Sequence, residues 1–505
     1  MKPKIRLLKR RSIKPTHKLQ TSIVNIKEIT KKIQTTFSQP FDLTTREFTV
    51  AGKYPATLFF IDTIAGGQRV SLEVIMPLTR MQPPGGKTKE NVVDLATKEL
   101  VSICKFEIKE TFDEVVSEIL NGKTILIIEG AKQFISLDTT QFEARGVAEP
   151  PTNSVVLGPR EGFIENLVVN IGLVRKRLKT PDLVLVNNVN GQYSQTNITI
   201  MYIKSIADQS VVDKVLEKIK SIEIDGILDS FYVMQYLQDE PLNIFRQVGN
   251  SEKPDVVASK VLEGRIAIFV DGSPVVLTVP YILLEDLQAA DDYYTNSTIV
   301  TLRRFIRLFG GVFAIILPAI YIAMQLYHYN IVPLNTLFLI TNSVENTPFS
   351  PLIEILIVLI LFEIMYEASL RMPRHLGAAT SLVAALVLGG TAIEAGLMSA
   401  PAVLVAALSL IMMYILPNLA PQISLLRFMF VIIAGILGLY GVVLGGILLV
   451  VYLASLDNFG TPLLAPFAPY VESDLKDGVV LKNIKDRTTR PESFPCKNKR
   501  RAKNG

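Results

Sequence analysis

The sequence predicts an α/β cytosolic N-terminal region of two subdomains, followed by an α-helical multi-pass membrane domain with four to five apolar segments. Residues 308–456 contain no lysine and no aspartate. Before them, short runs of β-branched and aromatic residues alternate with stretches of helical periodicity, as in α/β folds. The apolar stretch carries eight charged residues: Glu345, Glu354, Glu363, Glu367, Arg371, Arg374, Glu394 and Arg427.

The centre of the apolar stretch is an acidic helix over residues 351–373. It is long enough to cross a bilayer, which takes roughly 20 mainly apolar residues. A charge deep in a bilayer costs at least ~2.5 kcal/mol, so it normally faces a partner helix or a watery cavity. Glu363, Glu367 and Arg371 are spaced by four and share one helix face. Glu354 lies about 180° away around the helix.

Two interpretations of this face remain open. Glu367 and Arg371 could form an intrahelical ion pair near the cytoplasmic end that locks the bundle. Alternatively, Glu363, Glu367 and Arg371 form a hydrated stripe that lines an ion path, since two acids one turn apart repel each other unless water or a cation is near. Glu394 is either a pore-mouth residue or an interfacial one.

The composition limits the remaining function classes. A chain of 505 residues is enough for two or three domains. Cys104 and Cys496 lie far apart, so we expect no disulfide framework, no metal site and a reducing compartment. The sequence has no zinc, dinucleotide or nucleophile-elbow motif, and we therefore expect neither a cofactor nor enzymatic activity. Residues 81–88 end in Gly-Lys-Thr, like a phosphate-binding loop, but Met81 stands where that motif needs glycine. We therefore expect a solvated loop there.

Basic residues gather at both ends of the chain. The first twenty residues hold eight Lys or Arg and no acid, and the tail ends in a second basic run. Beside a membrane domain, such ends favour contact with anionic lipid headgroups. No aromatic residues are interleaved to indicate nucleic-acid binding. No apolar region follows the basic start, so we expect no signal peptide and a cytosolic N-terminal domain.

The N-terminal region divides into a basic disordered arm (1–22) and two subdomains (23–150 and 151–295). In the first we expect an amphipathic helix from Ile23 and strands at 46–50 and 56–61. A β-hairpin is expected at 123–137, and the same spacing of strand and turn residues recurs at 264–279. This recurrence indicates either equivalent hairpins in two related subdomains or a coincidence.

The second subdomain has an α/β pattern of its own. A helix with its apolar face at Phe163, Leu167, Ile171, Val174 and Leu178 ends in a basic cluster that suits a helix C-terminus. A strand near 196–202 and helices at 211–219 and 226–237 follow.

The membrane domain is expected over residues 296–456. Spans are predicted at 308–327, 351–371, 376–397 and 403–416, with Arg427 in the next loop. The loops then alternate in, out, in, out, in, with their positive charges on the inner side. The run 428–456 is too long for one upright span and is either tilted or a re-entrant hairpin. The side of the C-terminal segment (457–505) stays open.

Three motifs together resemble the GerA-type spore germination proteins, specifically the A subunit of the germinant receptor. They are Gly-Pro-Arg-Glu-Gly-Phe at 158–163, Gly-Arg-Ile-Ala-Ile-Phe-Val-Asp-Gly at 264–272, and Glu-Ile-Met-Tyr-Glu-Ala-Ser-Leu-Arg-Met-Pro at 363–373. The similarity extends from about residue 23 to 470, in the same order. Where relatives often carry glutamine after Gly377 and Gly389, this chain has Ala378 and Gly390.

The resemblance implies a multi-pass subunit in the inner spore membrane. It implies a homo-oligomer that conducts ions in response to a nutrient, together with a permease-like B subunit, a lipoprotein C subunit and membrane lipids. Candidate ion-path residues are Glu354, Glu363, Glu367, Arg371 and Glu394. The alternatives are a non-conducting scaffold subunit and a secondary transporter.

Overall fold

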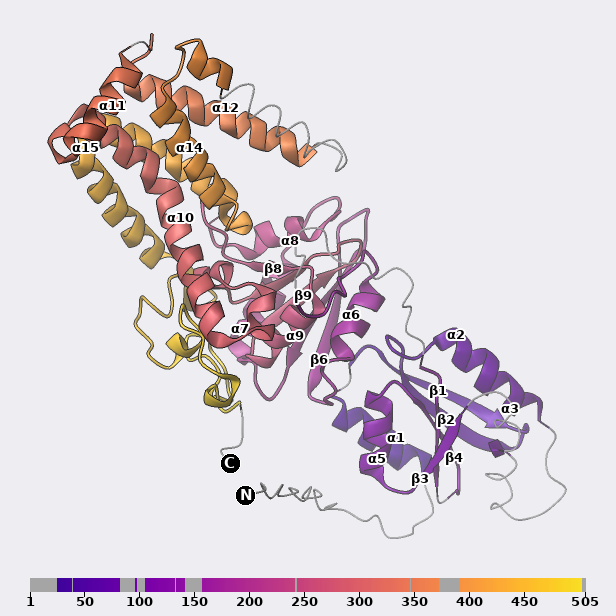
Figure 1. The fold of residues 1–505 in the computed structure, drawn as a ribbon. Helices are drawn as coiled ribbons and strands as arrows, with labels where there is room; N and C mark the ends of the chain where they lie inside the picture. The colour runs from indigo at the N-terminus through magenta and orange to yellow at the C-terminus, as the bar shows by residue number, and fades with distance from the viewer. Residues whose placement is uncertain are drawn as a thin grey trace, which may run out of the picture. The chain divides into compact units, whose positions relative to one another are not determined.

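A computed structural model describes residues 25–38, 40–81, 96–97, 105–131, 133–140, 157–240, 243–345, 347–371 and 390–501 (Figure 1). The chain forms two compact units. The first comprises Met1–Ser154, Pro159–Leu237 and Asn250–Thr278, and the second Val155–Gly158, Gln238–Gly249 and Val279–Gly505. The first unit is α/β and the second is mainly helical. The domain boundaries expected from the sequence remain predictions.

The first α/β subdomain is built on a five-stranded antiparallel sheet in the order β1-β2-β4-β5-β3. Helices α1 and α5 cover one face, and a continuous helical segment made of α2, a π-helical stretch and α3 covers the other. The strands are β1 (Leu43–Val50), β2 (Tyr54–Ile61), β3 (Phe106–Lys109), β4 (Thr124–Ile128) and β5 (Phe134–Leu137); the helices are α1 (Ile26–Thr36), α2 (Gly67–Arg69), α3 (Met76–Arg80) and α5 (Phe112–Leu120).

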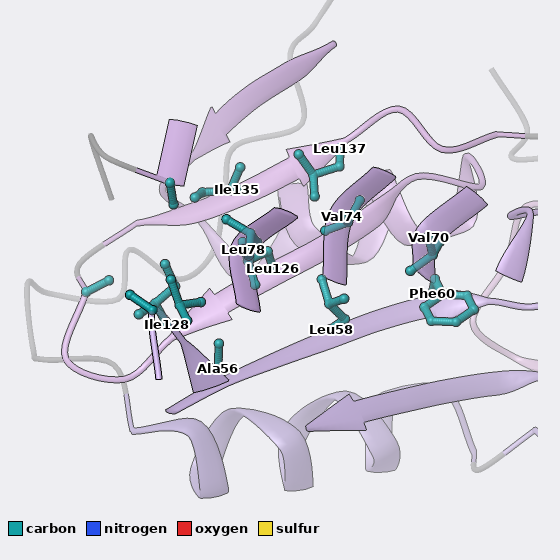
Figure 2. Close-up of a cluster of buried hydrophobic side chains, with 14 of the residues drawn as sticks. Ala56, Leu58, Phe60, Val70, Val74, Leu78, Leu126, Ile128, Ile135 and Leu137 are labelled. Atoms are coloured by element: carbon teal, nitrogen blue, oxygen red, sulfur yellow. The ribbon is translucent and has the colours of Figure 1, made fainter. Parts of the chain in front are cut away.

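Alternation along β2 divides the core into two layers. Leu58 and Phe60 point to the layer containing Val70 and Val74, as Figure 2 shows. Phe59 and Ile61 belong to the opposite layer, with α1 and α5. Successive strand residues face opposite sides of a sheet, so covering both sides buries every position. Each such side chain contributes roughly 1.5–3 kcal/mol on burial.

The second subdomain repeats the topology of the first. Its sheet has the order β6-β7-β9-β10-β8, which equals the first order with every strand number raised by five. The repeat and both hairpins expected from the sequence are therefore confirmed. The elements are β6 (Leu183–Asn190), β7 (Thr196–Ile203), β8 (Gly249–Ser251), β9 (Ile266–Val270), β10 (Val276–Val279), α6 (Leu167–Arg175), α7 (Gln209–Lys220), α8 (Ser230–Leu237) and α9 (Pro254–Leu262).

One local prediction in this subdomain is wrong. The helix expected from Phe163 begins at Leu167, because the Asn166 side chain caps it by accepting from the backbone of Val168 and Val169. Phe163 precedes the helix and packs edge-on against Phe269, with ring centroids 5.9 Å apart. Strand β6 and helices α5 and α9 were not expected from the sequence.

A buried ion pair joins the two subdomains. Arg175, at the end of α6, donates to Asp42, just before β1, through Nε at 2.8 Å and Nη2 at 2.7 Å. Both side chains are 1% exposed. Thr63 also donates to Asp42 at 2.9 Å. The basic cluster expected at this helix end is therefore partly a subdomain contact, while Arg177 donates to the carbonyl of Leu173 as a C-terminal cap.

The helical unit consists of α10 (Ser297–Leu326), α11 (Leu334–Val344), α12 (Pro351–Arg371), α14 (Ala400–Met413) and α15 (Ala420–Ser455). By length and composition, α10 and the 39 residues Pro417–Ser455 are apolar enough to cross a membrane. Most of the span expected at 376–397 lies outside the described residues. Helix α10 begins earlier than the expected span and includes Arg304, which is buried and paired with Asp292 at 2.9 Å.

Helix α15 is a hairpin of two helices. Gly438 has φ 62° and ψ −148°, which interrupts the helix. A Cβ on Gly445 would lie 3.4 Å from the ring of Phe430, whereas residues this far apart in a continuous helix are about 22 Å apart. Gly441 also approaches Ile433 so closely that a Cβ would lie 2.8 Å from its carbonyl oxygen. The chain therefore turns back at Gly438. Of the two interpretations of residues 428–456, the hairpin agrees with the structure and the single tilted span does not.

The hairpin corrects the prediction for Arg427, which lies inside the first half of α15 and not in a loop. It also brings the two ends of α15 together. Ala420 and Leu453 share one apolar cluster with Ala314 of α10 and Met413 of α14. The C-terminal segment thus leaves the bundle at the end where the chain enters α10.

We expect the replacement Asp42→Ala to lower the free energy of unfolding of the α/β unit by about 3–5 kcal/mol, because it leaves the buried Arg175 charge unpaired. Urea unfolding of the full chain, followed by circular dichroism, measures this change. Lys179→Ala is the control: Lys179 donates to Asn121 at an exposed position, and its loss should cost at most about 1 kcal/mol. Equal effects of the two replacements would contradict the assignment.

Acid should weaken the contact between Glu161 and Arg177. The Arg177 guanidinium donates to Glu161 at 2.7 Å and holds the pKa of that carboxyl below its ordinary value, although burial opposes the shift. The pair therefore stabilises the native state above the unfolded pKa of about 4.3, and this contribution is lost as the pH falls. Thermal melts of wild type and Glu161→Gln from about pH 6 to 3 should converge on acidification. A constant difference would disprove this.

Candidate functional site

A buried ion pair lies between two apolar helices of the second unit. Glu363 of α12 accepts from Nη2 of Arg427 in α15 at 2.8 Å. Arg427 is fully buried and Glu363 is 32% exposed. Ser424, one helical turn before Arg427, also donates to Glu363. A charge among apolar side chains needs such a partner, because its desolvation is otherwise uncompensated.

The same arginine extends the network to the other helices. Its Nη1 donates to the hydroxyl of Ser409 in α14 at 3.2 Å. Ser409 in turn donates to the backbone carbonyl of Ala314 in α10 at 2.6 Å. Helices α10, α12, α14 and α15 are therefore linked by one chain of hydrogen bonds. We call Glu363, Ser409, Ser424 and Arg427 the bundle network.

An arginine suits this position better than a lysine. Its planar guanidinium offers five N–H donors in a fixed fork, so that one side chain reaches groups on two helices. In Arg427, Nη1 and Nη2 serve different helices, α14 and α12. A lysine would have to reach both groups from one nitrogen atom, without two separate donor arms. The site is therefore geometrically specific as well as charged.

Glu367 and Arg371 lie on a different surface from the bundle network. They form an i,i+4 ion pair in which Glu367 is 54% and Arg371 78% exposed. The ion pair in one of the two interpretations is thus present. The three residues expected to form one stripe do not share one environment. Glu363 is bound by Arg427 of α15, whereas Glu367 and Arg371 face outward.

The other two candidate residues are separate again. Glu354 is 1% exposed and accepts from the backbone N–H of Ser399, which precedes α14. Glu394 is exposed, and no described contact joins it to the other four. The five candidate residues therefore occupy at least three places.

Sequence reasoning missed Arg427 as a member of this site. A signal was present, because Arg427 is the single basic residue between His375 and Lys476. An isolated arginine in an apolar stretch normally pairs with an acid on a neighbouring helix. Assigning it to a loop concealed that pairing. Ser409 and Ser424 carry no comparable signal, since serine is common at helix contacts in membranes.

We expect Glu363→Ala to destabilise the bundle by about 3–5 kcal/mol, because Arg427 would remain buried without its counter-charge. Thermal unfolding of the detergent-solubilised chain measures the loss. The double replacement Glu363→Gln/Arg427→Gln should be less damaging than the sum of its two single replacements. The matched control is Glu367→Gln on the same helix, which should change stability by less than about 1 kcal/mol. Comparable losses from both acids would contradict a special role of Glu363.

The chain matches a known protein family over most of its length. The model of the Bacillus/Clostridium GerA spore germination protein family matches residues 31–493. Spore germination protein GerLA of Bacillus cereus is 31% identical over 94% of this chain and 96% of its own. The uncharacterized membrane protein YfkQ of Bacillus subtilis is 37% identical over 79% of this chain and 78% of its own.

A solved structure was also found. The N-terminal domain of the A subunit of the Bacillus megaterium spore germinant receptor GerK3 is 28% identical, with a TM-score of 0.42, covering 52% of this chain and 98% of that domain. The family match and the relatives agree with the resemblance read from the sequence motifs. The chain belongs to the GerA family of spore germination proteins, the family of germinant receptor A subunits.

Proposed function

We propose that this chain is the membrane subunit of a nutrient-responsive germinant receptor and that copies of it assemble into a cation channel. In this proposal it lies in the inner spore membrane, with its N-terminal α/β region in the cytosol. It acts with a permease-like B subunit and a lipoprotein C subunit. Opening of the channel would release cations at the start of germination.

The observation that carries the proposal is the outward face of α12. Glu367 and Arg371 are exposed there, alongside Ile364 and Leu370, which are 60% and 63% exposed. Lipid around such a face would cost at least ~2.5 kcal/mol per charge. The face is therefore expected to meet another copy of the chain or water. A ring of copies supplies both, with apolar residues at the contacts and the charges toward an aqueous path.

The geometry of the bundle supports a multi-pass arrangement. The halves of α15 on either side of Gly438 have 18 and 17 residues, or about 26 Å each, close to a hydrocarbon core of ~30 Å. Helices α10, α12 and α14 pack with them around shared apolar clusters. In this arrangement the C-terminal segment lies on the side from which α10 enters.

A second candidate function is a scaffold subunit that conducts nothing. The bundle network favours it, because Glu363 is occupied by Arg427 and Ser424 and is not free to bind a passing ion. In that case the charges of α12 hold the bundle or a subunit contact together. The two functions differ in what the loss of Glu367 does, since Glu367 lies outside the bundle network.

Ion flux from liposomes separates the two functions. We expect the purified chain, assembled into oligomers, to release K⁺ or Na⁺, and Glu367→Gln to reduce the cation flux by about tenfold, as loss of a charge that concentrates cations would. Glu363→Gln tests assembly, read from the oligomer size. Glu394→Gln is a further exposed acid for comparison. Unchanged cation flux through a correctly assembled Glu367→Gln oligomer would overturn the ion-path role. The same measurement is repeated with the B and C subunits present.

A further inference from the structure

A second polar cluster lies away from the bundle network, where α10 ends and α12 begins. Glu354, Ser399 and Tyr321 are 1%, 1% and 8% exposed. They come from α12, the residue before α14, and α10. The hydroxyl of Tyr321 is close enough to the side chain of Ser399 for a loose hydrogen bond, and it lies within electrostatic range of Glu354.

Among the described residues, Oε2 of Glu354 has no hydrogen-bond partner. Oγ of Ser399 and the hydroxyl of Tyr321 have at most each other, and Oε1 of Gln325, one turn further along α10, has none. A buried polar atom without a partner destabilises the fold, and more so when it is charged. The buried Oε2 of Glu354 therefore suits an electropositive ligand.

Glu354 lies against the start of α14. Its other oxygen accepts from the backbone N–H of Ser399, the residue that precedes α14. A helix N-terminus carries about half a positive charge, which stabilises a carboxylate there. The sequence places no lysine or arginine between Arg307 and Arg371, so no basic side chain of that stretch competes for Glu354.

A pocket leads toward the cluster. It has a volume of about 370 Å³ and is lined by Tyr321, Gln325, Thr341, Glu345 and apolar residues. Glu345 is its charged lining residue and is exposed. The pocket therefore joins the acidic Glu345 to Tyr321 of the cluster, and an acidic lining attracts cations.

We propose that Tyr321, Glu354 and Ser399 form a binding site for one small monovalent cation, either an alkali metal ion or an ammonium group. A carboxylate and two hydroxyls are hard ligands of the kind that alkali ions prefer, and the same acceptors suit an ammonium. Bound there, the cation stabilises the junction of α10, α12 and α14. The site is separate from the outward face of α12, because Glu354 is 1% exposed whereas Glu367 and Arg371 are exposed.

Thermal unfolding of the full chain in detergent tests the site. KCl, NaCl, RbCl or methylammonium chloride is titrated in, and an equal amount of choline chloride is left out so that the ionic strength stays constant. A bound ligand that prefers the folded state raises the melting temperature, and the rise saturates as the site fills. Saturation by alkali ions identifies a metal ion, and saturation by methylammonium alone identifies an ammonium group. If none of these cations raises the melting temperature of the wild type above its value in choline chloride, the proposal is overturned. Buried water would then be the partner of the Glu354 oxygen.

The variants place the response at these residues. Glu354→Gln should abolish the cation-dependent rise, and Tyr321→Phe and Ser399→Ala, which each remove one oxygen, should raise the half-saturating concentration several-fold. These two milder changes keep the test valid if Glu354→Gln does not fold. Glu367→Gln removes an acid from the same helix outside the site and should retain the full response. A response that survives in both Tyr321→Phe and Ser399→Ala overturns the assignment.

Discussion

The fully buried charge of Arg427 constrains the helical half of this protein more than any other feature. An arginine in the middle of an apolar helical hairpin has to be compensated, and Glu363 of α12 provides the counter-charge at 2.8 Å. Through Ser409, the same side chain reaches the backbone of α10. Helices that would otherwise attract each other only through apolar packing are thereby held in a defined register. In an apolar surrounding, such polar contacts specify which helix faces meet.

The bundle network also changes how the acidic residues of α12 are understood. Spacing alone places Glu363, Glu367 and Arg371 on one face. In the folded chain Glu363 contributes to the structure of a single copy, and Glu367 and Arg371 are presented to whatever surrounds it. Glu354, on another side of the helix, joins an oxygen-rich cluster with Tyr321 and Ser399. One helix thus carries three kinds of acid, which differ because their neighbours differ.

The α/β unit shows the same dependence on a buried charge. Two subdomains of equal strand order are joined by Arg175 and Asp42, both 1% exposed. The two sheets have their own apolar layers, so neither needs the other for a core. The ion pair instead fixes the end of α6 against the start of β1.

The sequence by itself determined the α/β and helical division, most strands, both hairpins and the family. These follow from local periodicity, from turn residues such as Gly122, and from motifs whose residues lie close together in the chain. Only the tertiary structure decided the pairing of Glu363 with Arg427, the hairpin at Gly438 rather than a tilted span, and the buried oxygens around Glu354. The physical reason is that partners of a buried charge are selected by packing between helices, and residues far apart in sequence leave no local periodicity to show it.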